Sequence, residues 1–370
     1  MMSNSRIRLG ILQRVLPSYR VPLFDALADS LDGGVSVFAG DARREEMITG
    51  SISPQIAQYR KGRNIHLFKG RFYLCWQSGL LRWLREWDPD VLIMEANPRY
   101  LHSPGAIRWM RRRGRPVIGW GLGSPEADGS LARVRTVLRR HFIRRFDAMI
   151  TYSTLGAKEY DSLGYPSSRI FIAPNAARPK PKHPMPERGE EFRAGQPVIA
   201  FVGRLQSRKR IDTLIRACDM LEGNLRPLLW IIGDGPQCSQ LKALANEIYP
   251  LTEFHGAQHG QDLEKRLRLA DLFVLPGTGG LAVQEAMAFG LPVIVGESDG
   301  TQSDLVRDEN GWLLSENRAE ILAKTIKAAL SNLPSLREKG RASYRIVSEE
   351  INLEKMVAVF LETVDMVIES

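Results

Sequence analysis

Short apolar runs alternate with longer helical patterns through most of this chain, and this alternation constrains the fold more than any other feature. Each run is a few residues long, apolar on both faces, and followed by room for a helix. In the first half the runs are Ile7–Leu12, Val35–Ala39, Val91–Glu95, Pro116–Trp120, Ala148–Tyr152 and Ile170–Ala173. The pattern is typical of parallel strands that are covered by helices on both sides.

The alternation stops between Ala176 and Gln196, where four prolines are mixed with charged residues. A stretch of this composition is predicted to be a linker. A second series of runs follows it: Pro197–Val202, Leu228–Ile232, Glu253–His255, Leu272–Leu275 and Pro292–Val295. The predicted fold class is therefore α/β, with two doubly wound Rossmann-like domains that face each other across a ligand-binding cleft.

The predicted domains are residues 1–175, a linker over 176–196, and residues 197–350. Toward the end, apolar positions such as Ile326, Leu330 and Phe360 recur at helical spacing, so residues 351–370 are expected to form a helical tail that packs on the sheets. A length of 370 residues fits two domains of ordinary size. No apolar run approaches the roughly 20 residues that cross a bilayer, so a cytoplasmic location is expected.

The three cysteines, Cys75, Cys218 and Cys238, are far apart and lack the spacing of metal ligands. They are expected to be reduced thiols, with neither disulfides nor a structural metal.

The net charge of +9 hides an asymmetry between the two halves of the chain. Residues 1–186 contain 30 Lys and Arg against 15 Asp and Glu, which gives +15, whereas residues 187–370 carry −6. A basic domain predicts an anionic partner, either an anionic membrane surface at the inner face of the cell membrane or a phosphorylated acceptor. No module for nucleic acid is recognisable, and no nucleic-acid partner is expected.

Two predicted helices are unusually rich in arginine, Ile107–Arg113 and Leu131–Phe146. The second carries Val134, Leu138 and Phe142 at helical spacing. Its apolar side is therefore expected to lie on the sheet and its arginines in water. The number of arginines exceeds what solubility alone requires, which favours a binding role.

Two glycine-containing turns follow predicted strands of the second series. In GRLQSRK, Gly203–Lys209, a glycine lets the chain turn and brings Arg204 and Lys209 together, and such a pair suits a diphosphate. Solvated surface residues would explain the pair equally well. The second turn, GDGP at Gly233–Pro236, is common in doubly wound sheets and is weak evidence for function.

A third segment, PGTGGLAVQEAMAFGLPVIVG over Pro276–Gly296, predicts a strand, a glycine turn, a helix and a further strand. A helix that starts at Gly279 and Gly280 points unpaired N–H groups and its positive dipole end at a phosphate. Glu285 lies just over one turn inside this mostly apolar helix. A buried carboxylate needs a partner, which ribose hydroxyls would supply, although a solvated helix glutamate is the alternative.

Taken in order, these segments resemble retaining glycosyltransferases of the GT-B fold, in the large family of glycogen-synthase-like, lipopolysaccharide and mannosyl transferases. PNAA, Pro174–Ala177, is similar to the segment before the family's linker. The matching segments are GRLxxxKxxxxLIxA (Gly203–Ala217), GDGP, FHG (Phe254–Gly256), LxxADLFVLP (Leu267–Pro276) and EAMAFGLPVI (Glu285–Ile294).

The resemblance implies that Arg204 and Lys209 hold the diphosphate of a UDP- or GDP-linked sugar and that Glu285 binds its ribose. These three are the predicted catalytic residues. No metal and no cofactor beyond the donor are implied, because the basic pair and the helix end stabilise the leaving diphosphate. Sugar transfer to a saccharide or lipid-linked acceptor, with retained anomeric configuration, is the implied reaction. Further donor contacts are implied for Gly203, Gly233, Gly235, Phe254, Gly256, Gly279, Gly280 and Leu281.

Two positions depart from the family's pattern. Gly277 stands where many members have the first of two glutamates, and Leu122, in WGLG, stands where relatives often have a histidine. The resemblance therefore does not indicate which sugar is transferred, and it does not supply the transition-state contact that the histidine would make. A nucleotide-sugar epimerase on the same fold and a non-catalytic partner protein remain alternatives.

The first half of the chain offers four candidates for the acceptor side. Tyr19 and Arg20 follow the first predicted strand, and Glu95 and Asn97 lie at the end of the third. A turn tyrosine and a surface arginine would explain the first two equally well.

Overall fold

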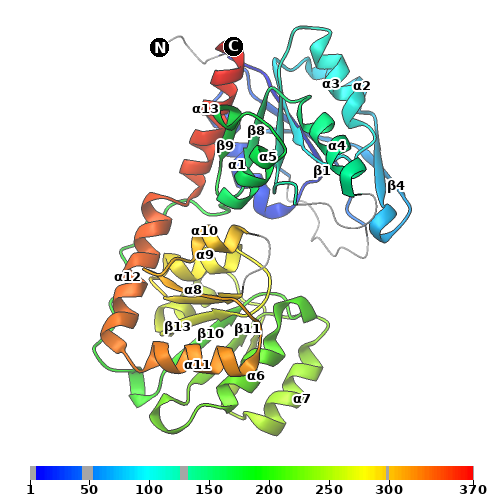
Figure 1. Cartoon of the computed structure of the whole chain (residues 1–370). Helices are drawn as coiled ribbons and strands as arrows, with labels where there is room; N and C mark the ends of the chain where they lie inside the picture. Colours follow the sequence, from blue (N-terminus) through cyan, green and yellow to red (C-terminus); the bar gives the residue numbers. More distant parts are fainter. Residues whose placement is uncertain (1–5, 44–52, 126–131, 297–299, 370) are drawn as a thin grey trace. The chain divides into compact units, whose positions relative to one another are not determined.

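The structure, a computed structural model, describes residues 6–43, 53–125, 132–296 and 300–369. It divides the chain into two compact units (Figure 1). Unit 1 comprises residues 1–177 and 353–370, and unit 2 comprises residues 178–352. The chain therefore leaves unit 1 once, builds unit 2 without interruption, and returns to unit 1 for its last helix.

Unit 1 is built on a sheet of seven strands among the described residues, and every pairing in it is parallel. Alternate residues of its central strands face two separate cores, as expected for a sheet that is covered on both sides. Val91 and Ile93 belong to one core, and Leu92 and Met94 to the other. In spatial order the strands are β3 (Gln58–Lys61), β2 (Val35–Gly40), β1 (Leu9–Val15), β6 (Val91–Glu95), β7 (Val117–Gly121), β8 (Ala148–Thr151) and β9 (Ile170–Ile172).

Helices and one β-hairpin complete unit 1. The hairpin, β4 (Arg63–Leu67) with β5 (Leu74–Ser78), is antiparallel and separate from the main sheet. The sequence analysis does not predict β3, β4 or β5, because their mixed polar and apolar residues lack the apolar run of a covered strand. The helices are α1 (Val21–Asp29), α2 (Leu80–Trp87), α3 (Ser103–Arg111), α4 (Ala132–Ile143), α5 (Thr154–Ser162) and α13 (Leu353–Glu369).

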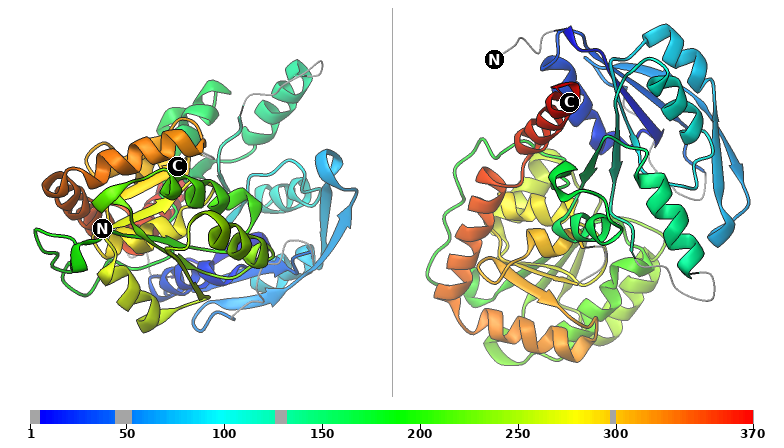
Figure 2. Two further views of the ribbon diagram at one scale, coloured as in Figure 1. Left: turned by 90° about the horizontal axis from the view of Figure 1, so that it is seen from below. Right: turned by 45° about the horizontal axis from the view of Figure 1, so that its top comes forward.

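The last helix, α13, is part of the core of unit 1. It contacts α1, β8 and β9, as the red helix in Figures 1 and 2 shows. Met356, Phe360 and Val364 are fully buried, and the Phe360 ring meets Trp120 edge-on at 4.9 Å between ring centroids. Residues far apart in the sequence therefore close one face of the unit 1 sheet.

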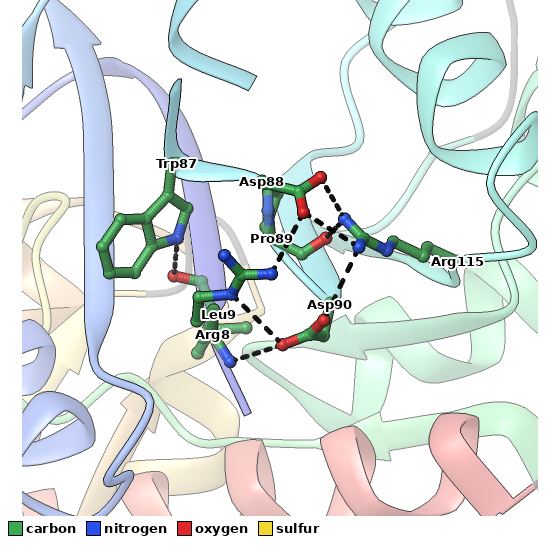
Figure 3. A network of polar contacts seen from close by, with 7 residues as sticks. All are labelled: Arg8, Leu9, Trp87, Asp88, Pro89, Asp90 and Arg115. Carbon is green, nitrogen blue, oxygen red and sulfur yellow. Dashed lines mark hydrogen bonds and ion pairs between the residues drawn. The ribbon is translucent and has the colours of Figure 1, made fainter. Parts of the chain in front are cut away.

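An ion-pair network holds the amino ends of the unit 1 strands (Figure 3). Arg115 donates to Asp88 at 2.5 Å and to the carbonyl of Pro89 at 2.9 Å. Arg8 donates to Asp88 through its side chain and to Asp90 through its backbone N–H. The hydrogen bond from Arg115 lowers the pKa of Asp88. This network lies at the end of the sheet opposite to the carboxyl ends of the strands.

Unit 2 is built on a sheet of six parallel strands among the described residues. In spatial order they are β12 (Thr252–Gly256), β11 (Leu228–Ile232), β10 (Val198–Val202), β13 (Leu272–Leu275), β14 (Val293–Gly296) and β15 (Gly311–Leu314). The sequence analysis does not predict β15. The helices are α6 (Ile211–Asp219), α7 (Cys238–Ile248), α8 (Gly260–Leu269), α9 (Leu281–Ala288), α10 (Thr301–Leu305), α11 (Ala319–Leu330) and α12 (Leu333–Glu349).

The proline-rich segment that was predicted as a linker packs on unit 2 from Arg178 onward. Arg188 donates to the carbonyls of Ala270, Phe289 and Leu267 at 3.0, 2.9 and 3.1 Å. Burial, with a smaller contribution from Arg337 nearby, lowers the pKa of this guanidinium to about 10. Among the described residues, no helix combines the length and the apolar character that crossing a bilayer requires.

Candidate active site

The loops after β10 and β13 leave the unit 2 sheet at the point where its strand order reverses. From β10 the chain proceeds outward to β11, whereas from β13 it proceeds outward to β14 on the other side. Ligands of open parallel sheets bind at such switch points. Two predicted segments meet there, Gly203–Lys209 after β10 and Pro276–Gly280 after β13.

These two loops touch through their backbones. The N–H of Thr278 donates to the carbonyl of Arg208 at 3.1 Å, and a Cβ added at Gly277 would lie 2.1 Å from that same oxygen. No side chain fits at position 277 unless a loop moves. The position at which many family members have a glutamate is therefore closed in this protein.

Lys209 occupies the centre of this contact. Its side chain is almost fully buried, and its Nζ donates to the carbonyl of Thr278 at 2.5 Å. A Cβ at Gly279 would lie 2.4 Å from this Nζ, so the ammonium group fills the space that glycine leaves open. Burial lowers the pKa of Lys209 to about 8, with a smaller contribution from Arg208. The group is thus a desolvated cation that an incoming anion would stabilise.

Helix α9 begins directly after this contact. Its first internal bond runs from the N–H of Gln284 to the carbonyl of Gly280 at 3.1 Å. The N–H groups of the turn from Leu281 therefore have no acceptor within the helix, and they form its positive end. Lys209 and the start of α9 together place positive charge at the switch point, which suits a diphosphate.

Glu285 is mostly buried one turn further along α9. Its Oε1 accepts a hydrogen bond from Arg178 at 2.6 Å. Burial raises the pKa of this carboxyl, whereas Arg178 and His259 act in the opposite direction. The alternative of a solvated helix glutamate does not fit this burial. The sequence analysis missed Arg178 and His259, because neither position carries a signal that links it to α9.

The other predicted donor residues divide into contacts within the sheet and exposed positions. A Cβ at Gly233 would lie 1.9 Å from the carbonyl oxygen of Gly203, so these two turns also touch through their backbones. A Cβ at Gly235 would likewise lie 2.5 Å from the carbonyl oxygen of Leu205. Arg204 lies on the exposed side of the loop that buries Lys209.

Two predicted donor residues come from β12. Phe254 is half-buried against the core, with Lys242 Nζ 5.8 Å from its ring centroid. Gly256, at the end of the strand, accepts a hydrogen bond from the N–H of Gly233 at 2.7 Å. The backbone of β12 is therefore joined to the β11 turn beside the switch point.

In unit 1 the equivalent switch point lies between β1 and β6, and all four acceptor-side candidates are near it. Arg20 is 7% exposed, so the surface-arginine alternative is wrong. Its guanidinium carbon lies 4.4 Å from the ring centroid of Trp120 and 4.8 Å from that of Tyr152, whose hydroxyl accepts a hydrogen bond from Arg20 Nη2 at 2.7 Å. Among the described residues, Nη1 of Arg20 has no hydrogen-bond partner.

The remaining candidates of unit 1 surround this buried cation. Glu95 accepts a hydrogen bond from the N–H of Arg14 at 2.5 Å, and burial raises its pKa while Arg14 and Arg20 lower it. Asn97 accepts from the N–H of Arg99 at 3.0 Å and so shapes its own turn. Tyr19 is 42% exposed.

Helix α4 packs on the sheet over a shorter length than its apolar residues predict. Phe142 and Ile143 are buried, but Val134 and Leu138 are 54% and 63% exposed. The prediction that its apolar side lies on the sheet was wrong for these two residues, because only the last turn of the helix packs against the core. Leu122, the residue in place of a family histidine, is 54% exposed.

Cys75 and Cys218 are buried, Cys238 is half-buried, and no disulfide joins any two of these three residues in the structure. Within the described part of the chain, no three His, Cys, Asp or Glu side chains cluster as metal ligands would.

Two α/β units, each with an all-parallel sheet and a site at its switch point, define the GT-B class of proteins. Residues 187–345 match the family described as glycosyl transferases group 1, and residues 35–176 match the glycosyl transferase 4-like domain. The chain belongs to this family of GT-B glycosyltransferases.

Curated relatives carry related descriptions. A GDP-mannose-dependent alpha-mannosyltransferase of Mycobacterium tuberculosis is 31% identical over 64% of this chain and 62% of its own length. The putative colanic acid biosynthesis glycosyltransferase WcaL of Escherichia coli is 29% identical over 52% of this chain and 50% of its own length. The chain thus spans about half to three fifths of the length of these relatives.

Solved structures share the fold along nearly the whole chain. Anabaena HepE in complex with UDP and glucose superimposes with a TM-score of 0.67 at 16% identity, and covers 97% of this chain and 99% of its own. The lipopolysaccharide outer core galactosyltransferase WaaB, in its apo form, gives a TM-score of 0.70 at 14% identity over 96% of this chain and 99% of its own. At these identities the likeness shows the fold alone.

Proposed function

We propose that this protein transfers a sugar from a nucleoside diphosphate sugar to an acceptor hydroxyl, with retention of anomeric configuration. The observation that carries the proposal is Lys209, a buried cation on the carbonyl of Thr278 at the start of α9. A desolvated ammonium group beside a helix N-terminus stabilises the charge that grows on a leaving diphosphate. The family match supports the same reaction class.

In the proposed reaction the bond from the anomeric carbon to the diphosphate oxygen breaks, and a bond to the acceptor oxygen forms on the same face. The acceptor proton passes to the leaving diphosphate. Glu285 positions the donor by accepting hydrogen bonds from ribose hydroxyls, while Arg178 keeps this carboxylate charged. The resemblance of the motifs to retaining glycosyltransferases supports the proposal of retention.

Positive charge for the leaving group comes from the chain itself in this proposal. Lys209, Arg208 and the N-terminus of α9 lie together, with Arg208 donating to the Thr278 hydroxyl at 2.8 Å. We therefore expect transfer without a bound divalent cation. Equal turnover in excess EDTA and in Mg²⁺ is the expected result, and a requirement for Mg²⁺ would contradict it.

The acceptor is proposed to bind unit 1 near Tyr19, Arg20, Glu95 and Asn97. Nη1 of Arg20, which has no hydrogen-bond partner among the described residues, suits an anionic or hydroxyl group. The basic composition of residues 1–186 suits a phosphorylated or lipid-linked saccharide.

Ligand screening tests the donor assignment. The full chain is mixed with UDP, GDP, ADP and their common sugar conjugates, and its melting temperature is measured. A ligand at 100 times its Kd stabilises the folded state by about 2.7 kcal/mol. GDP-mannose and UDP sugars come first, because a relative is named GDP-mannose-dependent and a solved neighbour holds UDP. No stabilisation by any nucleoside diphosphate, or an inverted product by NMR, would overturn the proposal.

A further inference from the structure

The β4–β5 hairpin presents an apolar face outward. Ile65 pairs with Trp76, and Leu67 with Leu74, on one face of the hairpin. Three of these side chains, Ile65, Leu67 and Trp76, are exposed by 41%, 38% and 45%. The outward face of an antiparallel pair is usually polar, so a contiguous apolar face there indicates a contact surface.

The opposite face attaches the hairpin to unit 1 through polar contacts. Gln77 donates through Nε2 to the carbonyl of Gln13 at 3.0 Å, and Asn64 donates to the carbonyl of Arg14 at 2.7 Å. Cys75 is fully buried beside them. The hairpin is thus fixed by one face, and its outer face is not required for the attachment.

The tip of the hairpin carries two more exposed rings. Phe68 and Phe72 are 68% and 65% exposed. Phe68 also has a φ of 59°, a left-handed conformation that asparagine or glycine adopts at lower cost than phenylalanine. Folding gains nothing from an exposed ring in this conformation, so the presence of Phe68 points to a role outside the fold.

The charged residues of the segment that contains the hairpin have a single sign. Residues 58–85 contain seven Lys and Arg and no Asp or Glu. Arg60 pairs with Glu86 and Lys61 with Asp41, at the base of the hairpin. Arg63 and Lys69 lie closer to the apolar face, within the hairpin itself.

We propose that the β4–β5 hairpin docks unit 1 on an anionic lipid bilayer. The five exposed apolar side chains enter the headgroup region, and the basic residues lie against lipid phosphates. Aromatic rings with basic neighbours are the chemistry of such an interface. The charged residues within the hairpin, residues 63–78, are all basic, which matches an anionic surface. Docking is a partner interaction beyond sugar transfer, and it is tested without the reaction.

Co-sedimentation with vesicles tests the docking. The full chain is mixed with neutral phosphatidylcholine vesicles and with vesicles that contain phosphatidylglycerol, at low and moderate salt. We expect binding to the anionic vesicles alone, and weaker binding as salt rises. The double variant Phe68→Asn/Phe72→Ser should lose at least about tenfold in partition, because two aromatic side chains no longer enter the interface.

Two further variants provide the controls. Met220→Ser/Leu269→Ser removes two exposed apolar side chains from unit 2, which are 49% and 38% exposed, and it should bind vesicles as the parent does. Asparagine accepts the φ of residue 68, so the hairpin variant should melt no lower than the parent.

Three results would overturn the proposal. The first is equal binding of the parent to neutral and anionic vesicles, or to neither. The second is that the hairpin variant binds vesicles as the parent does, whereas the variant Val134→Ser/Leu138→Ser on α4 no longer binds them. The third is a parent that is a dimer and a hairpin variant that is a monomer, with no vesicle binding by either. Sugar transfer does not enter these measurements, so a failed transfer assay would leave the docking result standing.

Discussion

The two switch points of this chain have the same arrangement of parallel strands, but one is built mainly from backbone contacts and the other from side-chain contacts. In unit 2 the loops after β10 and β13 meet backbone to backbone, with glycines at the contact and Lys209 as the buried side chain between them. In unit 1 the contact is made by side chains: the guanidinium of Arg20, in the loop after β1, lies on the rings of Trp120 in β7 and Tyr152 after β8.

This difference separates two kinds of site. A backbone site fixes its ligand by N–H groups that every residue has, so it suits the constant part of a donor, its diphosphate. A side-chain site can change with each substitution, so it suits an acceptor that differs between relatives. The four predictions below test this division between the units.

The largest effect is expected for Lys209→Met. Removal of the buried cation should lower kcat by about 10²-fold or more, because the leaving diphosphate loses a preorganised charge. Arg204→Ala should have a smaller effect in the same direction, since its side chain is exposed. Lys265→Met, on the exposed surface of α8, is the control and should leave kcat unchanged.

Folding stability distinguishes this role from a structural one. Burial lowers the pKa of Lys209 to about 8, so between that pH and the ordinary lysine pKa the unfolded chain binds more protons. Stability of the parent should therefore rise with pH across this window. Lys209→Met should lack this rise and be no less stable at pH 7. A folded Arg204→Ala/Lys209→Ala variant with full activity would end the assignment.

Glu285→Gln is expected to weaken nucleotide binding by about tenfold to a hundredfold, because a charge-assisted acceptor is lost. Arg178→Met should bind the nucleotide as the parent does at neutral pH, but the pH below which binding is lost should shift upward. Burial raises the pKa of Glu285 and Arg178 lowers it, so removal of Arg178 raises this pKa further. Binding should then fail at a higher pH than in the parent. Calorimetry from pH 4 to pH 8 measures this, and loss of binding at the same pH as in the parent would contradict the pairing.

A backbone site should reject a single methyl group. Gly277→Ala places a Cβ 2.1 Å from the carbonyl of Arg208, and we expect a loss of about 1 to 3 kcal/mol in stability together with weaker nucleotide binding. Gly280→Ala is the matched control, since within the described part of the chain its Cβ would meet only Leu305 at 3.4 Å and Thr301 at 3.8 Å. Equal behaviour of the two variants in thermal melts would show that the loop contact is loose.

The smallest effect is expected in unit 1. Arg20→Lys keeps the charge but loses the planar stacking on Trp120 and Tyr152, which contributes about 1 kcal/mol. The KM for the acceptor should rise while donor affinity measured by calorimetry stays the same. A change in donor affinity alone would place Arg20 on the donor side and would break the division between the units.

The sequence predicted the covered strands well, because a run such as Val91–Met94 has no polar residue to allow another arrangement. The sequence did not predict β15 or the β4–β5 hairpin, because successive residues along these short strands face different surroundings and do not form the apolar run of a covered strand. The glycine turns and Lys209 were identifiable as ordered motifs. Arg178 and the closed position at Gly277 were not, because both depend on a contact between segments 69 or more residues apart.

The return of the chain to unit 1 determines the order in which the units can mature during synthesis. Unit 2 is one uninterrupted segment, so it can fold as soon as residue 352 has left the ribosome. Unit 1, although it begins first, still lacks Met356, Phe360 and Val364 at that moment, so Trp120 lacks the edge-on contact with the Phe360 ring. Unit 1 of the nascent chain therefore keeps an exposed hydrophobic face until its last helix emerges, which makes it the part of the newly synthesised chain that most needs a chaperone.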